Sequence, residues 1–566
     1  MKIFKWSLLL IAVLALGHFG PKAWKARVQK PPVEIAWEVK EQKSFVIITP
    51  SYNNAKWCEK NLRSILDQNY DHYRVIYIDD ASTDGTYEKV EKIIHESGQA
   101  HRFTLLHNER NQGAAANLYK AIHMCQDHEI AVLVDGDDQL AHEDVLNKLN
   151  STYANPDVWV TYGSYVEYPS YKKGGWAKPI PASVLEKNEA RKHKWGASHL
   201  KTFYVSLFKQ IYVQDLLYEG RFLESSSDVA IMLPLIEMAG THAHFVKDVL
   251  YVYNHLNPLN DDKLRWQKQF DMVSYIRSLP SYQPIEELPQ EEYHREGADL
   301  LVFSYNRPLQ LYAFLESVQT YVKGLEEVVV LYRADPAFAD AYEKVKVAFP
   351  QVRFCAQGSN PASDFKPLTL ELIQRGSSPY ILMAVDDIVV KDAVDIQECT
   401  DALKKTHGYA FFLRLGKTID YCYMQNKSED IPPSIELQSN VYAWQFKMGQ
   451  KDWRYLHNID MTIYRKEDIL PRLHKLEFTH PTSLESKWAL KGNKNMVGLY
   501  FDASKIVNVP LNVVQNAEAN RHMQSYTPEE LLKKFESGLK IDIKPFHQIS
   551  NHSLHIESEI TFVPRS

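Results

Sequence analysis

Three carboxylates follow an apolar run in the first third of the chain. Residues 130–134 predict a buried strand, and Asp135-Gly136-Asp137-Asp138 comes directly after it. Crowded carboxylates repel one another unless a cation neutralises them, and their oxygens suit Mg²⁺ or Mn²⁺, which also bind phosphate oxygens. Ligands of open α/β sheets bind beyond the carboxyl ends of the strands. The stretch therefore predicts a metal and diphosphate site, with an acidic turn that only solvates a strand end as the alternative.

Polar side chains also follow other predicted strands. Strands are expected at 44–50, 74–80, 103–107 and 130–134, and helices at 60–68, 86–97 and 114–124. This alternation predicts βαβ units and a parallel sheet. Because parallel strands end at one edge, several polar residues would gather there. They are Tyr52, Asp80, Asn111 and Asp137.

Length and composition limit the function classes. The 566 residues are too many for one ordinary domain, and the net charge of -6 offers no basic surface to attract nucleic acid. The five cysteines are widely spaced and form no CxxC pair, so neither a zinc site nor a disulfide framework is indicated. We expect a globular protein that does not bind nucleic acid.

Four motifs then occur in a fixed order, TPSYN, IDDASTDGT, NQGAAAN and VDGDD. Together they resemble the family 2 glycosyltransferases of the GT-A fold, over roughly residues 44–262. The resemblance implies a nucleotide-sugar donor, most often a UDP-sugar, and Mn²⁺ or Mg²⁺ as cofactor. The donor-binding residues that it implies are Pro50, Tyr52, Asp80, Asn111 and Asp135.

The resemblance also implies individual roles. Tyr52 would stack near the base, and Asp80 would contact the uracil or ribose. Asp135 and Asp137 would form the DXD pair, with Asp137 as the direct metal ligand. His255 lies in a loop where the family often places a histidine near the diphosphate or metal, although a structural histidine is equally open.

An inverting transfer needs a base for the acceptor hydroxyl. The family places an aspartate at the start of a helix, and Asp228 occupies that position here, although Ser227 replaces the usual glutamate before it. Glu224 is the rival base, and capping of a helix at 229–239 is the structural alternative for Asp228. The QxxRW motif of processive synthases is absent, which favours transfer of single sugars.

The N-terminal segment, residues 1–30, predicts a membrane attachment. An apolar run at 6–19 is followed by more basic residues than precede it, so the positive-inside rule favours an uncleaved anchor with cytosolic domains. Ala15-Leu16-Gly17 could instead end a cleaved signal peptide, which would export the protein.

The second half begins after a Pro- and Glu-rich linker at 278–297. Ser304-Tyr305-Asn306 repeats Ser51-Tyr52-Asn53, and Asp386-Asp387 repeats the acidic strand end, so residues 298–566 predict a duplicated architecture.

This half resembles a second, more distant GT-A glycosyltransferase domain through SYNRP, AVDDI, HPTSLE and VPLN. By the same resemblance, Tyr305 would bind a donor, Asp387 a metal, and Glu485 would be the base. The alternative is a domain that has lost catalysis and only binds carbohydrate.

We therefore expect an α/β protein with two tandem GT-A domains, each with a mostly parallel sheet, behind a hydrophobic anchor. The first domain, residues 44–265, would transfer a sugar from a nucleotide diphosphate to a glycan or lipid-linked acceptor, and an active second domain would make the protein bifunctional. A sugar-phosphate nucleotidyltransferase and a non-catalytic scaffold are the rival classes. The former would have a Gly-rich, Arg-containing loop where PSYNN stands.

Overall fold

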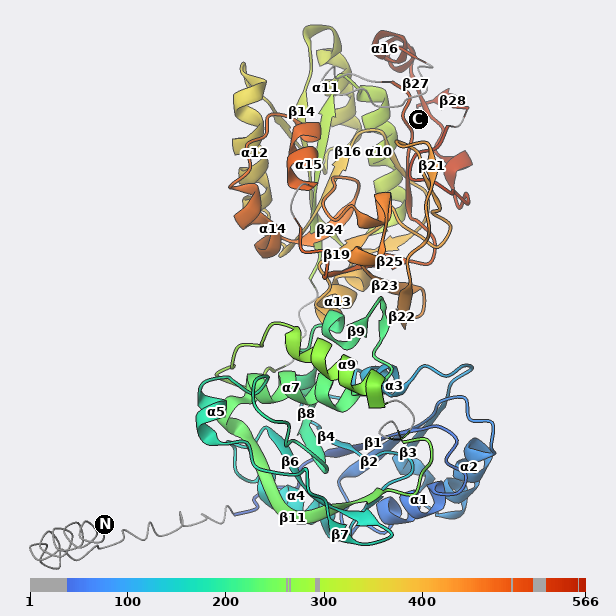
Figure 1. Ribbon diagram of the computed structural model, residues 1–566. Helices are drawn as coiled ribbons and strands as arrows, with labels where there is room; N and C mark the ends of the chain where they lie inside the picture. The colour runs from blue at the N-terminus through green and yellow to red at the C-terminus, as the bar shows by residue number, and fades with distance from the viewer. Residues whose placement is uncertain are drawn as a thin grey trace, which may run out of the picture.

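Two α/β domains follow one another along the chain, each built on a nine-stranded mixed sheet (Figure 1). The computed structural model describes residues 38–260, 263, 266–290, 296–489, 492–512, 526–557 and 559–565.

The first sheet has the strand order β3-β2-β1-β4-β8-β6-β11-β5, with β7 paired to β6. Its strands are β1 (Phe45–Ser51), β2 (Tyr73–Asp79), β3 (Phe103–His107), β4 (Ile130–Leu133), β5 (Gln139–Leu140), β6 (Val160–Tyr168), β7 (Lys172–Lys173), β8 (Lys201–Tyr204) and β11 (Ala243–Asn254). The strands β3, β2, β1 and β4 are parallel, whereas β8 runs antiparallel to both β4 and β6. The expected mostly parallel sheet is thus a mixed one, in which β3, β2, β1 and β4 are parallel neighbours and β6 and β11 form a further parallel pair.

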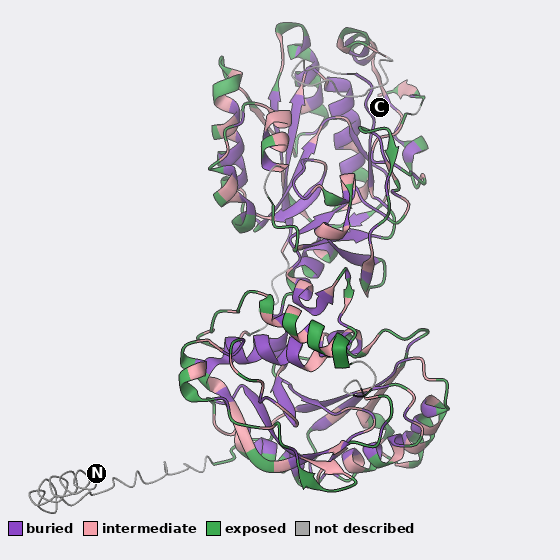
Figure 2. Cartoon of the chain, in the orientation of Figure 1, coloured by how far each residue is buried: buried purple, intermediate pink, exposed green. Residues whose placement is uncertain are grey.

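Apolar side chains on the central strands fix this sheet between helices. Val46, Ile47 and Ile48 of β1 are fully buried, as expected for a strand that is covered on both faces. The helices of this domain are α1 (Cys58–Leu66), α2 (Thr86–Glu96), α3 (Ala114–Ile122), α4 (Val145–Tyr153), α5 (Ala182–Glu186), α6 (Val205–Phe208), α7 (Ser227–Ala239) and α9 (Trp266–Ser278). Helix α7 is buried from Val229 to its end, where Figure 2 shows it in purple.

The second sheet has the order β15-β14-β12-β16-β24-β19-β25-β23-β22. Its strands are β12 (Ala298–Tyr305), β14 (Leu325–Arg333), β15 (Arg353–Ala356), β16 (Tyr380–Val385), β19 (Ala410–Phe412), β22 (Ser434–Gln438), β23 (Val441–Gln445), β24 (Thr462–Arg465) and β25 (Val497–Phe501). The helices are α10 (Pro308–Tyr321), α11 (Ala339–Ala348), α12 (Pro361–Arg375), α13 (Ile396–Thr406), α14 (Lys466–Leu473), α15 (Pro481–Ala489) and α16 (Pro528–Glu536).

The two sheets share one topology. Four parallel strands in the order third, second, first and fourth are followed by an antiparallel strand, β8 in the first sheet and β24 in the second. A short strand after each acidic turn then pairs antiparallel with a later strand, β5 with β11 and β17 (Ile388–Val390) with β26 (Ile506–Asn508). The internal repeat that the sequence predicted therefore extends to strand order and direction.

The two domains touch at several points. The backbone N–H of Gly220, in the turn between β9 (Leu217–Tyr218) and β10 (Arg221–Phe222), donates to Gln445 Oε1 at 3.0 Å. Nε2 of His407 lies 2.9 Å from the Lys209 carbonyl oxygen, and its ring packs on Tyr212. The segment expected as a linker is also attached, since Tyr282 donates to Asp215 Oδ2 at 2.6 Å.

The expected membrane anchor is corrected by the structure. Among the described residues no helix has both the length and the apolar composition needed to cross a bilayer. Helix α7, for example, has 13 residues and reaches about 20 Å, against the roughly 30 Å of a hydrocarbon core. Residues 1–30, on which the membrane-anchored localisation and its signal-peptide alternative depended, lie outside the described part of the chain. We do not retain the membrane assignment.

Candidate active site

The acidic turn after β4 lies against the end of β1. The N–H of Gly136 donates to the Pro50 carbonyl oxygen at 3.0 Å. A Cβ atom at Gly136 would come within 2.5 Å of Cβ and Oγ of Ser51, so the turn needs glycine for this close approach. The side-chain amide of Asn61 in α1 donates to the carbonyl oxygens of Asp135 and Asp138, at 3.0 and 2.8 Å. These contacts fix the turn at the carboxyl edge of the sheet.

Asp137 is held by an amide from a distant loop. Nδ2 of Asn257 donates to Asp137 Oδ2 at 2.7 Å and lies 3.4 Å from the Asn54 side-chain oxygen. Burial, with a smaller contribution from the negative charge of Asp135, raises the pKa of Asp137 to about 6. A nearby cation would favour the ionised carboxylate.

Asp138 supports the turn from the opposite side. Its carboxylate accepts hydrogen bonds from the Tyr251 hydroxyl at 2.7 Å and from the Asn254 N–H at 2.6 Å. The same Tyr251 hydroxyl accepts from the N–H of Asp135 at 3.2 Å. These hydrogen bonds connect Asp138, next to β5, with β11. Because Asp138 is only 1% exposed, Asp135 and Asp137 are the more accessible carboxylates of the turn.

The carboxylates of this turn suit a metal ion that a bound substrate would also coordinate. Within the described ranges, no three His, Cys, Asp or Glu side chains are grouped to hold a metal ion. Mg²⁺ is commonly held by one or two carboxylates together with waters and substrate phosphates, and Asp135 and Asp137 match that arrangement. The raised pKa of Asp137 shows that its ionised form is disfavoured here, and a bound cation would offset that effect.

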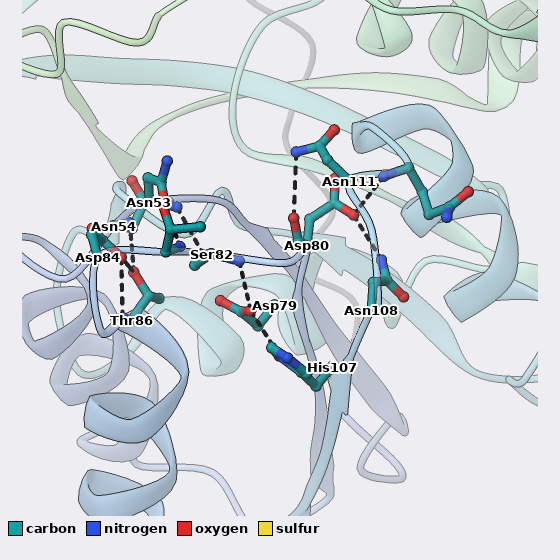
Figure 3. Close-up of polar contacts among 12 residues, drawn as sticks. Asn53, Asn54, Asp79, Asp80, Ser82, Asp84, Thr86, His107, Asn108 and Asn111 are labelled. Atoms are coloured by element: carbon teal, nitrogen blue, oxygen red, sulfur yellow. Dashed lines mark hydrogen bonds and ion pairs between the residues drawn. The ribbon is translucent and has the colours of Figure 1, made fainter.

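The turn after β1, residues 51–54, is hydrogen-bonded to the turn after β2 (Figure 3). The N–H of Asn53 donates to Ser82 Oγ at 2.9 Å, and Asn53 Oδ1 accepts from the Thr83 N–H at 2.9 Å. One residue on, the N–H of Asn54 donates to Thr86 Oγ1 at 2.8 Å. Tyr52 itself is 41% exposed, which leaves its ring accessible to a ligand.

Asp80 anchors the loop that follows β3 (Figure 3). Its carboxylate accepts from Asn108 Nδ2 at 2.7 Å and from the N–H groups of Gln112 and Gly113, both at 2.8 Å. Asn111 is exposed, and its amide lies 3.3 Å from the Asp80 carbonyl oxygen. Asp80 and Asn111, both predicted to bind the nucleotide-sugar donor, thus lie together. The buried Asp80 carboxylate, however, holds the loop after β3.

Asp79 was absent from the predicted site. It is fully buried, with Oδ2 accepting from the Ser82 N–H at 3.1 Å and lying 3.0 Å from Nδ1 of His107. The two adjacent aspartates therefore fix the loops that follow β2 and β3, one each.

Asp228 lies in the first turn of α7, where the N-cap position belongs to Ser226. Its Oδ2 is 3.3 Å from Nζ of Lys201, and its side chain is 39% exposed while that of Lys201 is 6% exposed. Lys201 begins β8 and pairs with Leu133 of β4. This pairing places the ammonium and Asp228 beside the strand that leads to Asp135.

The rival base and the predicted histidine lie in other surroundings. Glu224 forms an ion pair with Lys268 of α9. His255 is exposed, and its N–H donates to the Tyr168 carbonyl oxygen, whereas Asn257 two residues later contacts Asp137. His199 is buried and stacks on Tyr251 with ring centres 4.5 Å apart, and burial lowers the pKa of His199 well below its usual value.

The second domain repeats the turns with different side chains. Tyr305 donates to Asp335 Oδ2 at 3.0 Å, which ties the end of β12 to the turn after β14. Asp386 and Asp387 both bind Arg307, at 3.0 and 3.2 Å. Glu485 lies half-buried in α15, and its Oε1 is 3.4 Å from the N–H of Ile459.

Three functional candidates were missed from the sequence, Lys201, Asn257 and Arg307. Lys201 and Asn257 belong to β8 and to the loop after β11, whose positions depend on antiparallel pairing across long sequence separations. Arg307 had a visible signal, because it replaces the second asparagine of the Ser-Tyr-Asn-Asn turn.

Comparison with known proteins gives the class of this domain. Residues 46–216 match the model of glycosyl transferase family 2. The chain therefore contains a family 2 glycosyltransferase domain, which confirms the resemblance drawn from its motifs.

Two curated relatives match parts of this chain. The bifunctional glycosyltransferase pgtA of Dictyostelium discoideum is 26% identical over 198 residues, 31% of this chain and 25% of that protein. The putative teichuronic acid biosynthesis glycosyltransferase TuaG of Bacillus subtilis is 38% identical over 99 residues, 16% of this chain and 35% of that protein. The chain thus spans a minor part of either relative.

Among solved structures, Staphylococcus aureus TarS 1-349 in complex with UDP-GlcNAc aligns with a TM-score of 0.33 and 17% identity, covering 41% of this chain and 65% of that chain. The mannosyltransferase PcManGT of Pyrobaculum calidifontis, in complex with GDP-Man and Mn²⁺, aligns with a TM-score of 0.29 and 22% identity, covering 40% and 60%.

Proposed function

We propose that the first domain transfers a sugar from a nucleotide diphosphate donor, with UDP-sugars as the first donors to test, to a hydroxyl of a glycan or lipid-linked acceptor. The observation that carries this proposal is the position of Asp135 and Asp137 at the carboxyl edge of the sheet, together with the ion pair between Asp228 and Lys201, whose strand pairs with the strand that leads to Asp135. The exposed ring of Tyr52 at the same edge provides a surface for a nucleoside base.

The proposed reaction is a single displacement with inversion. The acceptor oxygen forms a bond to the anomeric carbon as the bond from that carbon to the diphosphate oxygen breaks, and the hydroxyl proton passes to a carboxylate oxygen of Asp228. Lys201 holds that carboxylate in place. Asp135 and Asp137 would hold Mn²⁺ or Mg²⁺, which when bound stabilises the charge of the departing diphosphate.

Donor hydrolysis and transfer by the whole chain test this function. A panel of nucleotide sugars is offered with Mn²⁺, with Mg²⁺ and with EDTA, and release of the nucleoside diphosphate is measured. We expect release from at least one donor, its loss in EDTA, and a loss of at least a hundredfold in Asp137→Asn.

Glu143→Gln is the matched control, because it removes one carboxylate from the exposed surface six positions along the chain. It is expected to keep full activity. Undiminished turnover by a folded Asp137→Asn variant would refute the proposed role of this carboxylate.

A further inference from the structure

The ends of β1 and β12 carry nearly the same turn. Ser51-Tyr52-Asn53-Asn54 in the first domain corresponds to Ser304-Tyr305-Asn306-Arg307 in the second. Asn53 and Asn306 both have φ of 53°, and both side chains accept a hydrogen bond from the backbone of the turn after the next strand, at 2.9 Å. The turns are therefore equivalent in conformation and contacts, and the fourth residue is where they differ.

That fourth residue faces the acidic turn in both domains. Asn54 is neutral, and its side-chain oxygen lies 3.4 Å from the amide of Asn257, which binds Asp137. In the second domain the guanidinium of Arg307 lies 3.0 Å from Asp386 Oδ1 and 3.2 Å from Asp387 Oδ2. The exchange of asparagine for arginine thus brings a fixed positive charge to the acidic turn.

Asn512 completes the second arrangement. It follows β26, as Asn257 follows β11, and its side-chain oxygen accepts from Arg307 Nε at 2.9 Å. Asn257 instead donates to a carboxylate. The loop after β11 therefore positions a carboxylate, whereas the loop after β26 positions a guanidinium.

Burial makes this arginine difficult to displace. The side chains of Arg307, Asp386 and Asp387 are 11%, 5% and 20% exposed. A divalent ion would need ligand oxygens at about 2.0–2.6 Å, in space that the guanidinium fills, and it would place a double positive charge beside a buried single one. The acidic turn of the second domain does not fit the metal that its resemblance to the first domain implies.

We propose that Arg307 takes the place of a divalent cation in the second domain, so that the chain binds one such ion, at Asp137, and the second domain binds its ligands without metal. The inference rests on the proposed metal dependence of the first domain. It also replaces our expectation that Asp387 is a metal ligand.

Counting bound Mn²⁺ tests the inference. The full chain is titrated with Mn²⁺ in the presence of UDP, and free Mn²⁺ is followed by electron paramagnetic resonance. We expect one ion per wild-type chain and none per Asp137→Asn chain. Mn²⁺ that remains on Asp137→Asn and disappears in the Asp137→Asn, Asp387→Asn double variant would overturn the inference.

Variants at Arg307 provide the reverse test in the Asp137→Asn background. Arg307→Asn copies the first domain and is expected to create one Mn²⁺ site that Asp387→Asn removes, whereas Arg307→Lys keeps the charge and is expected to create none. If the Arg307→Asn chain folds but binds no additional Mn²⁺, the proposal that Arg307 takes the place of a divalent cation is contradicted. If Arg307→Asn fails to fold, the first titration decides.

The proposed function fails in a different way. If Mn²⁺ is bound equally by wild type and Asp137→Asn, and Asp387→Asn changes nothing, then the metal site assigned to the first domain is wrong. Arg307→Asn would still show whether the second domain gains an ion.

Discussion

Asn257 donates a hydrogen bond of 2.7 Å to Asp137 across 120 residues of sequence. The amide approaches the carboxylate oxygen that the acidic turn presents at the edge of the first sheet. Asn257 therefore positions the proposed metal ligand from a loop that no local pattern connects with it.

Replacing Asn257 by alanine is expected to weaken Mn²⁺ binding in the presence of UDP about tenfold. A hydrogen bond to a charged group is worth about 1.5–3 kcal/mol, and part of it is recovered by water. Asn260→Ala is the control from the same loop, because the Asn260 amide donates to Tyr253 and to the Asn254 carbonyl oxygen. Equal effects of the two variants would show that only the loop conformation matters.

Asp228 and Glu224 can be separated as bases by kinetics. Asp228→Asn is expected to lower kcat a hundredfold or more with KM for the donor little changed, because only proton removal is lost. Glu224→Gln is expected to keep kcat within a few-fold, since Glu224 pairs with Lys268. The opposite pattern, with turnover lost in Glu224→Gln and kept in Asp228→Asn, would assign the base to Glu224.

Asp80 and Asn111 are expected to differ in their effect on stability. Asp80→Ala leaves three donors of the loop after β3 without their acceptor and is expected to lower the free energy of unfolding by about 1–3 kcal/mol. Asn111→Ala removes an exposed side chain and is expected to change it by less than about 0.5 kcal/mol. Urea unfolding of both variants measures the difference, and equal stabilities would contradict the anchoring role of Asp80.

His457 is expected to make the second domain sensitive to acid. Burial lowers the pKa of His457 from 6.5 to about 3, and Nε2 of the ring lies 2.8 Å from the Tyr409 hydroxyl. Between these two values the unfolded chain binds more protons than the folded one. The free energy of unfolding therefore falls as pH falls from 6.5 towards 3, by up to about 1.4 kcal/mol per pH unit.

Thermal unfolding from pH 8 to pH 4 measures this effect in wild type and in His457→Gln. The variant is expected to be less stable at pH 8, since it loses the stacking of His457 on Trp488, but to have a shallower pH dependence. Parallel curves for the two proteins would show that His457 does not titrate as its burial implies.

Local patterns were sufficient for the parallel half of each sheet. The strand expected at 103–107 has those bounds in the structure, because short apolar runs between turn residues and helices leave few other pairings. The family match over residues 46–216 also spans the four motifs at the strand ends. These features depend on neighbours in sequence, which a single chain displays.

The antiparallel half and its side chains required the structure. Lys201 reaches Asp228 only because β8 inserts between β4 and β6, and Asn257 reaches Asp137 only because β11 pairs with β5. Such pairings are set by tertiary packing and loop closure over long separations, and local periodicity carries no information about them.

The hydrogen bond from the Gly220 N–H to Gln445 Oε1 joins the two domains. Gly220 lies eight residues before Asp228, whereas Gln445 ends β23 in the second sheet. A ligand of the second domain that shifts β23 would therefore act on a residue in the segment that leads to the proposed base. If such a shift changes the affinity of the first domain for its donor, then by reciprocity a bound donor changes the affinity of the second domain for its ligand by the same factor.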